Sequence, residues 1–282
     1  MSVDMLQKRI RKMKNPAMVV LAPAADQIPA GYENAEGYCV ALLEAMKEKV
    51  PAVRIHLGAF ALLGPDGLSQ MANVMKKARE LEYYILLDWA CIEEPAMAEE
   101  SAKKILVDEI WDCDGVVIGG YAGTDCIKPY VAASEEKKKD VFVVLKTANK
   151  SGSELQDLQT GGRHVFTASA DRVNRLAEGC VERCGYSRVG AMAGANSEIS
   201  LKSLREKYPK LFLIVDGMDA PNSNSKFASA AFDRMGYGAV CCGSTSVLGA
   251  WKTAEAGSDP VKCAVETLDR FKRNINRYIT IL

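Results

Sequence analysis

The stretch LLDWACIEEP, residues 86–95, places acidic side chains directly after an apolar run. Asp88 follows the run, and Glu93 and Glu94 come five and six positions later. Carboxylates at this position act as acids, bases or electrostatic stabilisers, because parallel α/β folds place their chemistry just beyond the strand ends. No basic residue lies between the two acidic positions, and Ala90 stands among the intervening residues. The stretch therefore has the acids of an active site without a proton-donating partner.

Further candidate residues follow other apolar runs. If these runs are parallel strands, their carboxyl ends meet at one face, and the residues beyond them share a site. The segments concerned are Ala22, 54–56, 88–93, 119–121, 146–149, 216–223 and 243–246.

The elements that would position these residues alternate regularly along the chain. Eight short apolar runs recur, with little polar alternation inside them, which is typical of parallel strands that are covered on both faces. The predicted strands are 18–22, 52–57, 83–87, 115–119, 141–145, 188–194, 211–215 and 238–243.

Segments with helical spacing separate the runs. They include 67–82, 225–236 and 259–279, the last opening with an Asp cap and a proline at the first helical position. Residues 1–15 predict a short amphipathic helix before Pro16. Eight such units in 282 residues predict a single (β/α)8 TIM barrel domain over residues 1–282. A doubly wound sheet is the alternative, but the first turn lacks the G-x-G-x-x-G of dinucleotide binding.

Composition excludes several classes of protein. Lys plus Arg and Asp plus Glu both number 36, so no charge excess draws nucleic acid or an acidic membrane. We expect no membrane span and no secretory signal. The nine cysteines are odd in number and scattered, which indicates reduced thiols in a cytoplasmic protein. Cys180 and Cys184 share a helix face, but with only two histidines in the chain we expect no metal site, and we expect no cofactor.

Several segments together resemble the longer bacterial branch of the orotidine 5′-phosphate decarboxylase family. VLAPAADQIP is similar to its first strand, VRIHLGAFALLGPDG to its second and GVVIGGYAGTDCIKPYV to its fourth. VFVVLKTANKSGSELQDL is similar to the branch's T-S-N-P-G-S and L-Q-D segment, and the match continues through RVGAMAGANSEISLKSLREKYPKLFLIVDG. The resemblance implies a TIM barrel, a lyase of pyrimidine biosynthesis and a homodimer.

The resemblance also implies a catalytic charge array, formed by a Lys on the second strand and D-x-K-x-x-D after the third. In this sequence Arg54 takes the place of the first Lys, and Asp88 matches the first Asp. Ala90 falls on the Lys that protonates the product carbon, and Glu93 falls on the second Asp. The loop is therefore interpreted as the family's catalytic loop without its acid.

Other family positions differ as well. The ribose-binding Asp is Ala22, the Thr after the acidic motif is Met97, and Pro221 replaces the Gln of the phosphate loop, where Gly217 is kept. Thr245 stands where the family has a phosphate-binding Arg. The residues that the resemblance leaves as candidates for binding a small phosphorylated or nucleotide-like ligand are Lys146, Thr147, Asn149, Gly217, Ser244 and Thr245.

Three hypotheses follow. The chain is a non-catalytic family member that acts as a ligand-binding or interaction protein, or an enzyme on another small substrate that uses Asp88, Glu93 and Arg54. The third is a working decarboxylase with a relocated lysine, for which Lys146 is the nearest candidate by strand position. A buried ion pair among Asp88, Glu93 and Arg54 that only holds the barrel mouth is the structural alternative to catalysis.

Overall fold

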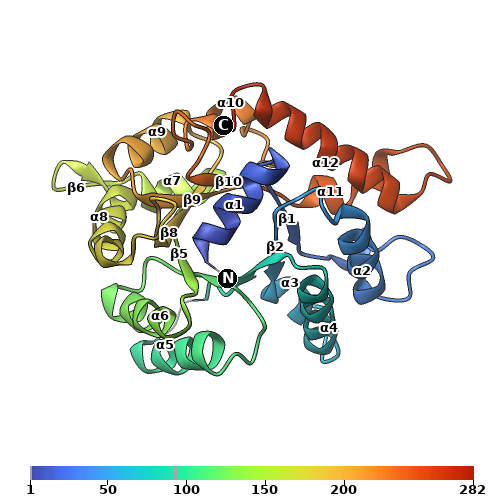
Figure 1. Ribbon diagram of the computed structural model, residues 1–282, viewed down its shortest axis with the longest axis horizontal. Coiled ribbons are helices and arrows are strands. Elements are labelled where there is room, and N and C mark those ends of the chain that lie inside the picture. The colour runs from blue at the N-terminus through green and yellow to red at the C-terminus, as the bar shows by residue number, and fades with distance from the viewer. Residues whose placement is uncertain (1, 92–93) are drawn as a thin grey trace.

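The computed structural model describes residues 2–91 and 94–282, and its centre is a closed barrel of parallel strands (Figure 1). Around the barrel the strands follow the order β1-β10-β9-β8-β5-β4-β3-β2. Every predicted apolar run forms one of them, so the predicted (β/α)8 fold is confirmed. Their bounds are β1 Ala17–Leu21, β2 Ala52–His56, β3 Tyr84–Asp88, β4 Gly115–Ile118, β5 Asp140–Lys146, β8 Ser187–Gly194, β9 Leu211–Asp216 and β10 Ala239–Gly243.

Helices between the strands form the outer layer (Figure 1). The longer ones are α2 Ala35–Met46, α4 Gly67–Glu80, α5 Pro95–Ala102, α6 Thr124–Lys137, α8 Val165–Ala177, α9 Glu198–Lys207 and α12 Pro260–Asn276. A π-helix, η2 (Lys103–Val107), continues α5. The predicted cap of the last helix is confirmed, since the Asp259 side chain accepts hydrogen bonds from the N–H groups of Val261 and Lys262. Within the described residues, no helix combines the length and apolar character that crossing a membrane requires.

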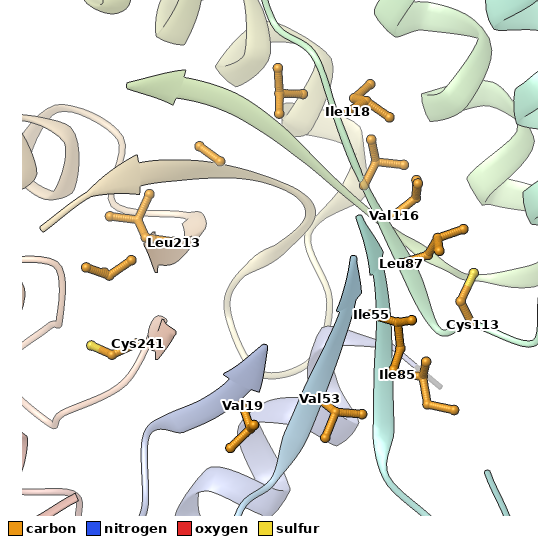
Figure 2. Packing of buried hydrophobic residues seen from close by; sticks show 14 of the residues in the cluster. Val19, Val53, Ile55, Ile85, Leu87, Cys113, Val116, Ile118, Leu213 and Cys241 are labelled. Carbon is orange, nitrogen blue, oxygen red and sulfur yellow. The ribbon is translucent and has the colours of Figure 1, made fainter. Parts of the chain in front are cut away.

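Strand residues alternate between two buried layers. Val19, Val53 and Leu87 belong to the layer between the strands and the helices, which Figure 2 shows from close by. Met18 and Leu86, which neighbour them in sequence, belong to a second cluster inside the barrel. Because both strand faces are buried, the sequence shows continuous apolar runs in place of alternation.

The amino ends of the strands are covered by α1 (Val3–Met13), as the prediction of a helix in residues 1–15 anticipated. Val3, Leu6 and Ile10 are completely buried against the barrel interior. The helix also bonds to residues that directly precede strands: Arg9 Nε donates to the Pro51 carbonyl at 2.9 Å. The opposite end of the barrel remains for a functional site.

A buried acid lies under this helix and leads to a testable pH dependence. Asp140 is completely buried at the start of β5, and the Tyr84 hydroxyl donates to its Oδ2 at 2.6 Å. Burial raises the pKa of Asp140 well above its usual range, so the folded protein holds this proton more tightly than the unfolded chain. The associated stability is present at acidic pH and is lost as pH rises through the raised pKa.

We therefore expect Asp140→Asn to flatten the alkaline side of the stability profile, because the amide is neutral at every pH. Melting temperatures measured from about pH 4 to pH 8 should fall less for the variant than for the unchanged protein. Parallel profiles would contradict this prediction.

Two local features differ from the sequence prediction. The helix expected over 225–236 is only α10 (Ser225–Ser229). The Asp233 side chain accepts the N–H groups of Met235 and Tyr237, and this turn replaces the helical hydrogen bonds. A hairpin of β6 (Gln159–Thr160) and β7 (Arg163–His164) was not predicted, although its two-glycine turn is a hairpin signal.

Candidate functional site at the barrel mouth

A pocket of about 500 Å³ opens at the carboxyl ends of the strands, where a TIM barrel carries its site. Mostly apolar walls with a few polar groups are typical of small-molecule sites. Of the residues that the resemblance singled out as site residues, Arg54, Asp88 and Thr147 line it, together with Ala90. The other lining residues are His56, Cys91, Gly119, Gly120, Tyr121, Ala122, Val144, Leu155, Met192 and Asp216.

Arg54 forms the floor of the pocket. Its side chain, which is 6% exposed, reaches from β2 across the barrel to Met192 on β8, where Nη1 lies 3.3 Å from the sulfur. Nε lies 3.1 Å from Asp88 Oδ2. Nη1 and Nη2 lie 3.1 and 3.3 Å from the two carboxylate oxygens of Asp216. The predicted ion pair of Arg54 and Asp88 is confirmed, and Asp216 joins it as a partner that the sequence did not reveal.

This guanidinium is charged despite its burial. Burial by itself lowers the pKa of Arg54, but the carboxylates of Asp216 and Asp88 outweigh that effect and raise the pKa above its ordinary value. A buried charge with partners on two sides resists displacement, because removing either partner leaves it unpaired in a poorly solvated place. Arg54 therefore joins β2, β3 and β9 across the mouth.

His56 is a site residue that the sequence reasoning did not single out, although it lay within a segment predicted to reach the mouth. It ends β2, and its Nδ1 accepts the N–H of Ala59 at 3.2 Å. A neutral ring therefore carries its proton on Nε2, which lies 3.9 Å from Asp88 Oδ2, beyond hydrogen-bonding distance. The signal that could have found it is a histidine at a strand end in a chain with only two histidines.

Lys146 turns away from the pocket. Its ammonium pairs with Asp157 and lies 5.1 Å from the centre of the Phe166 ring, on the helix side of the barrel wall. The strand register shifts between Val144 and Lys146, so Val144 lines the pocket and Lys146 does not. A β-bulge of this kind re-aims a side chain. The predicted ligand-binding role of Lys146 thus has no support from its position.

The loop after β5 is fixed by hydrogen bonds within the protein, without a ligand. The backbone N–H of Thr147 donates to Gln156 Oε1 at 2.9 Å, and the Gln156 amide donates to Thr147 Oγ1 at 2.9 Å. Asn149 is exposed and is not a lining residue of the pocket. Gly217 has φ +67°, and a Cβ there would lie 2.1 Å from the Ala148 side chain. Close packing against the loop therefore accounts for this glycine without a ligand.

The two segments that the resemblance assigned to phosphate binding, around Gly217 and around Thr245, are hydrogen-bonded to each other. The carboxylate of Asp219 accepts the backbone N–H of Ser244 at 2.9 Å and that of Ser246 at 3.4 Å. Thr245 begins the four-residue helix α11 and is not a lining residue of the pocket. An internal carboxylate thus takes the N–H groups that an anion would need.

The acidic loop after β3 is described in part. Ala90 lines the pocket and exposes only a methyl group to it, whereas Glu93 lies outside the described residues. Trp89 packs against the helix-side core and is not a lining residue of the pocket.

Comparison with known proteins places this site in a family. The model of the orotidine 5′-phosphate decarboxylase / HUMPS family matches residues 33–231, more than half of the chain. The chain belongs to this family. The resemblance read from the sequence is thereby confirmed.

Individual relatives agree with the family assignment, and a solved structure agrees with the fold. The chain is 27% identical over 256 residues to an orotidine 5′-phosphate decarboxylase of Rhodopirellula baltica, covering 89% of this chain and 84% of the relative. Identity to the Clostridium novyi decarboxylase is 24%, over 98% of both chains. The OMP decarboxylase structure of Leishmania donovani superposes with a TM-score of 0.75 at 22% identity, over 99% of both chains, and supports the fold.

Proposed function

We propose that this member of the decarboxylase family does not catalyse the reaction for which the family is named and uses its barrel mouth to bind a different small molecule. The observation that carries the proposal is the composition of the pocket: among its described lining residues there is no lysine, and Ala90 stands where the resemblance places the proton donor. A methyl group cannot donate a proton to a carbanion.

The remainder of the site supports the same proposal. A phosphorylated nucleotide needs cationic or N–H donors, and charge-assisted pairs are the strong ones. Arg54 is paired with two carboxylates, Asp219 accepts N–H groups of the loop after β10, and Thr245 stands at the position of the phosphate Arg. The relocated-lysine hypothesis loses support, because Lys146 faces Asp157.

A second candidate function is an enzyme on another substrate. His56 and Asp88 both line the pocket with their polar atoms 3.9 Å apart, and a bound substrate between them would meet an imidazole and a carboxylate. Replacing His56 with Ala separates this from simple binding, because turnover would fall while ligand affinity would change little.

An assay of orotidine 5′-phosphate decarboxylation tests the proposal directly. Turnover at a rate ordinary for a decarboxylase would overturn it. Absence of turnover by folded protein would support it.

Assembly as a homodimer belongs to the same proposal. The resemblance implies pairing through the open end of the barrel, and α5 begins there with an apolar, exposed turn in which Met97 is 56% exposed. Burial of apolar surface favours association by about 25 cal/mol per Å².

We expect light scattering to report a dimer at tens of micromolar, roughly the range in which weak protein interfaces form. Met97→Glu should shift the protein toward monomer, because a symmetric interface carries each change twice. Ile110→Glu is the matched control, since Ile110 is similarly exposed, at 55%, but precedes β4 at the other end of the barrel. A monomeric unchanged protein would contradict the prediction.

A further inference from the structure

The charges of the mouth pocket do not cancel. Arg54 contributes one positive charge, and Asp88 and Asp216 contribute two negative charges. Among the described residues that line the pocket there is no second Arg and no Lys. These three side chains together carry one net negative charge, which disfavours an anion in a partly desolvated site.

The positive charge is also unavailable to an incoming anion. Nε of Arg54 faces Asp88, and both terminal nitrogens face Asp216. A phosphate or a carboxylate would have to displace one of these carboxylates, which would then lack its partner. The Asp216 side chain is 31% exposed, so its carboxylate stays within reach of a ligand.

A second position for an anion is closed independently. The N–H groups of Ser244 and Ser246 already point at the carboxylate of Asp219. A phosphate approaching this loop would meet a negative charge in the place where it needs donors.

The walls of the pocket define the remainder of the ligand. Val144, Met192 and Leu155 present apolar surface, and the hydroxyl of Tyr121 donates to the Leu145 carbonyl, which fixes the ring at the rim. A volume of about 500 Å³ suits one small organic molecule. A ring or an aliphatic body packs on such walls, and its polar group meets Asp216.

We infer that the mouth pocket selects a small organic cation, an apolar or aromatic body bearing an ammonium group, and rejects phosphates and carboxylates. This inference rests on the proposed function, because a pocket that processed orotidine 5′-phosphate would have to accept an anion.

Three probes of matched size and different charge test the inference: 2-phenylethylamine, 2-phenylethanol and 3-phenylpropionate. Titrations are followed by NMR of the methionine methyl groups, and the Met192→Leu variant identifies the resonance that lies in the pocket. We expect the amine to shift the Met192 signal with a Kd about tenfold or more below that of the carboxylate, the factor of one contact to a charged group. Added salt should reduce this preference, because it screens the charge.

Variants assign the selectivity to its source. Asp216→Asn should remove most of the preference for the amine, whereas Glu255→Gln, an equal change of charge at an exposed residue that does not line the pocket, should keep it. Asp219 lies in an exposed loop, and Asp219→Asn should increase the affinity for uridine 5′-phosphate, because it removes the negative charge that a phosphate would meet there. Salt dependence in the unchanged protein provides a measure that does not depend on the folding of Asp216→Asn.

Equal or tighter binding of the carboxylate, failure of the amine to bind, or an unchanged preference in folded Asp216→Asn would overturn the inference. Ordinary decarboxylation of orotidine 5′-phosphate would instead overturn the proposed function. If the protein is inactive on that substrate and still shows no preference for the amine, only the inference on ligand class fails.

Discussion

Purified protein is expected to decarboxylate orotidine 5′-phosphate several orders of magnitude more slowly than an active member of the family. General acid catalysis alone contributes roughly 10²–10⁴-fold, and Ala90 provides no proton. Arg54 cannot supply it, because its guanidinium stays protonated and is paired with Asp88 and Asp216. The loss of phosphate contacts lowers the rate further, since binding energy remote from the reacting carbon also supports catalysis. A steady-state assay of uridine 5′-phosphate formation measures this.

Restoring the lysine tests whether its loss is the whole defect. Ala90→Lys is expected to remain inactive, because Asp219 still accepts N–H groups of the loop after β10 and Thr245 still replaces the Arg. Ala122→Lys is a matched control, which adds the same side chain at another exposed position of the pocket lining. Activity in Ala90→Lys alone would show that the remainder of the site is intact and would contradict the proposal that the mouth no longer binds the family's phosphorylated substrate.

The barrel could be predicted from sequence because its determinants are local. Each strand is a short apolar run that is buried on both faces, and helix starts such as Asp259 with Pro260 carry their own capping residues. Helix 225–236 was predicted too long, since the competing bonds come from a single side chain, Asp233, whose turn only appears in three dimensions. Periodicity shows which face a residue prefers, but it does not show which polar group will compete for the backbone.

The site was only partly predictable, because its key contacts join strands that lie far apart in the sequence. Asp216 is 162 positions from Arg54, and nothing local to either residue indicates that they pair. Lys146 follows an apolar run as Thr147 does, yet a bulge in β5 turns it to the outside. Asp219 lies in a segment expected at the barrel mouth, but nothing in the sequence indicates that it accepts N–H groups of the loop after β10. Closure of the barrel decides these contacts.

Replacing Arg54 with methionine is expected to lower the free energy of unfolding by about 3–5 kcal/mol, the cost of removing one partner from a buried ion pair. Methionine retains much of the volume of the side chain, so the loss measures the uncompensated carboxylates of Asp88 and Asp216. Urea denaturation followed by circular dichroism gives this free energy. The matched control is Arg163→Met, because Arg163 pairs with Asp171 at the surface with its side chain 52% exposed, and such pairs contribute about 1 kcal/mol or less.

Two further variants separate charge from packing at this position. Arg54→Lys keeps the charge, but one ammonium cannot bond to carboxylates on both β3 and β9 as the planar guanidinium does, so we expect an intermediate loss. The triple variant R54M/D88N/D216N removes all three charges and should regain most of the stability, because no buried charge is then left unpaired. If Arg54→Met loses no more than Arg163→Met, the ion pairs across the mouth do not hold the barrel together. Arg54 would then be kept for its contribution to the pocket, and its role would have to be sought in ligand binding.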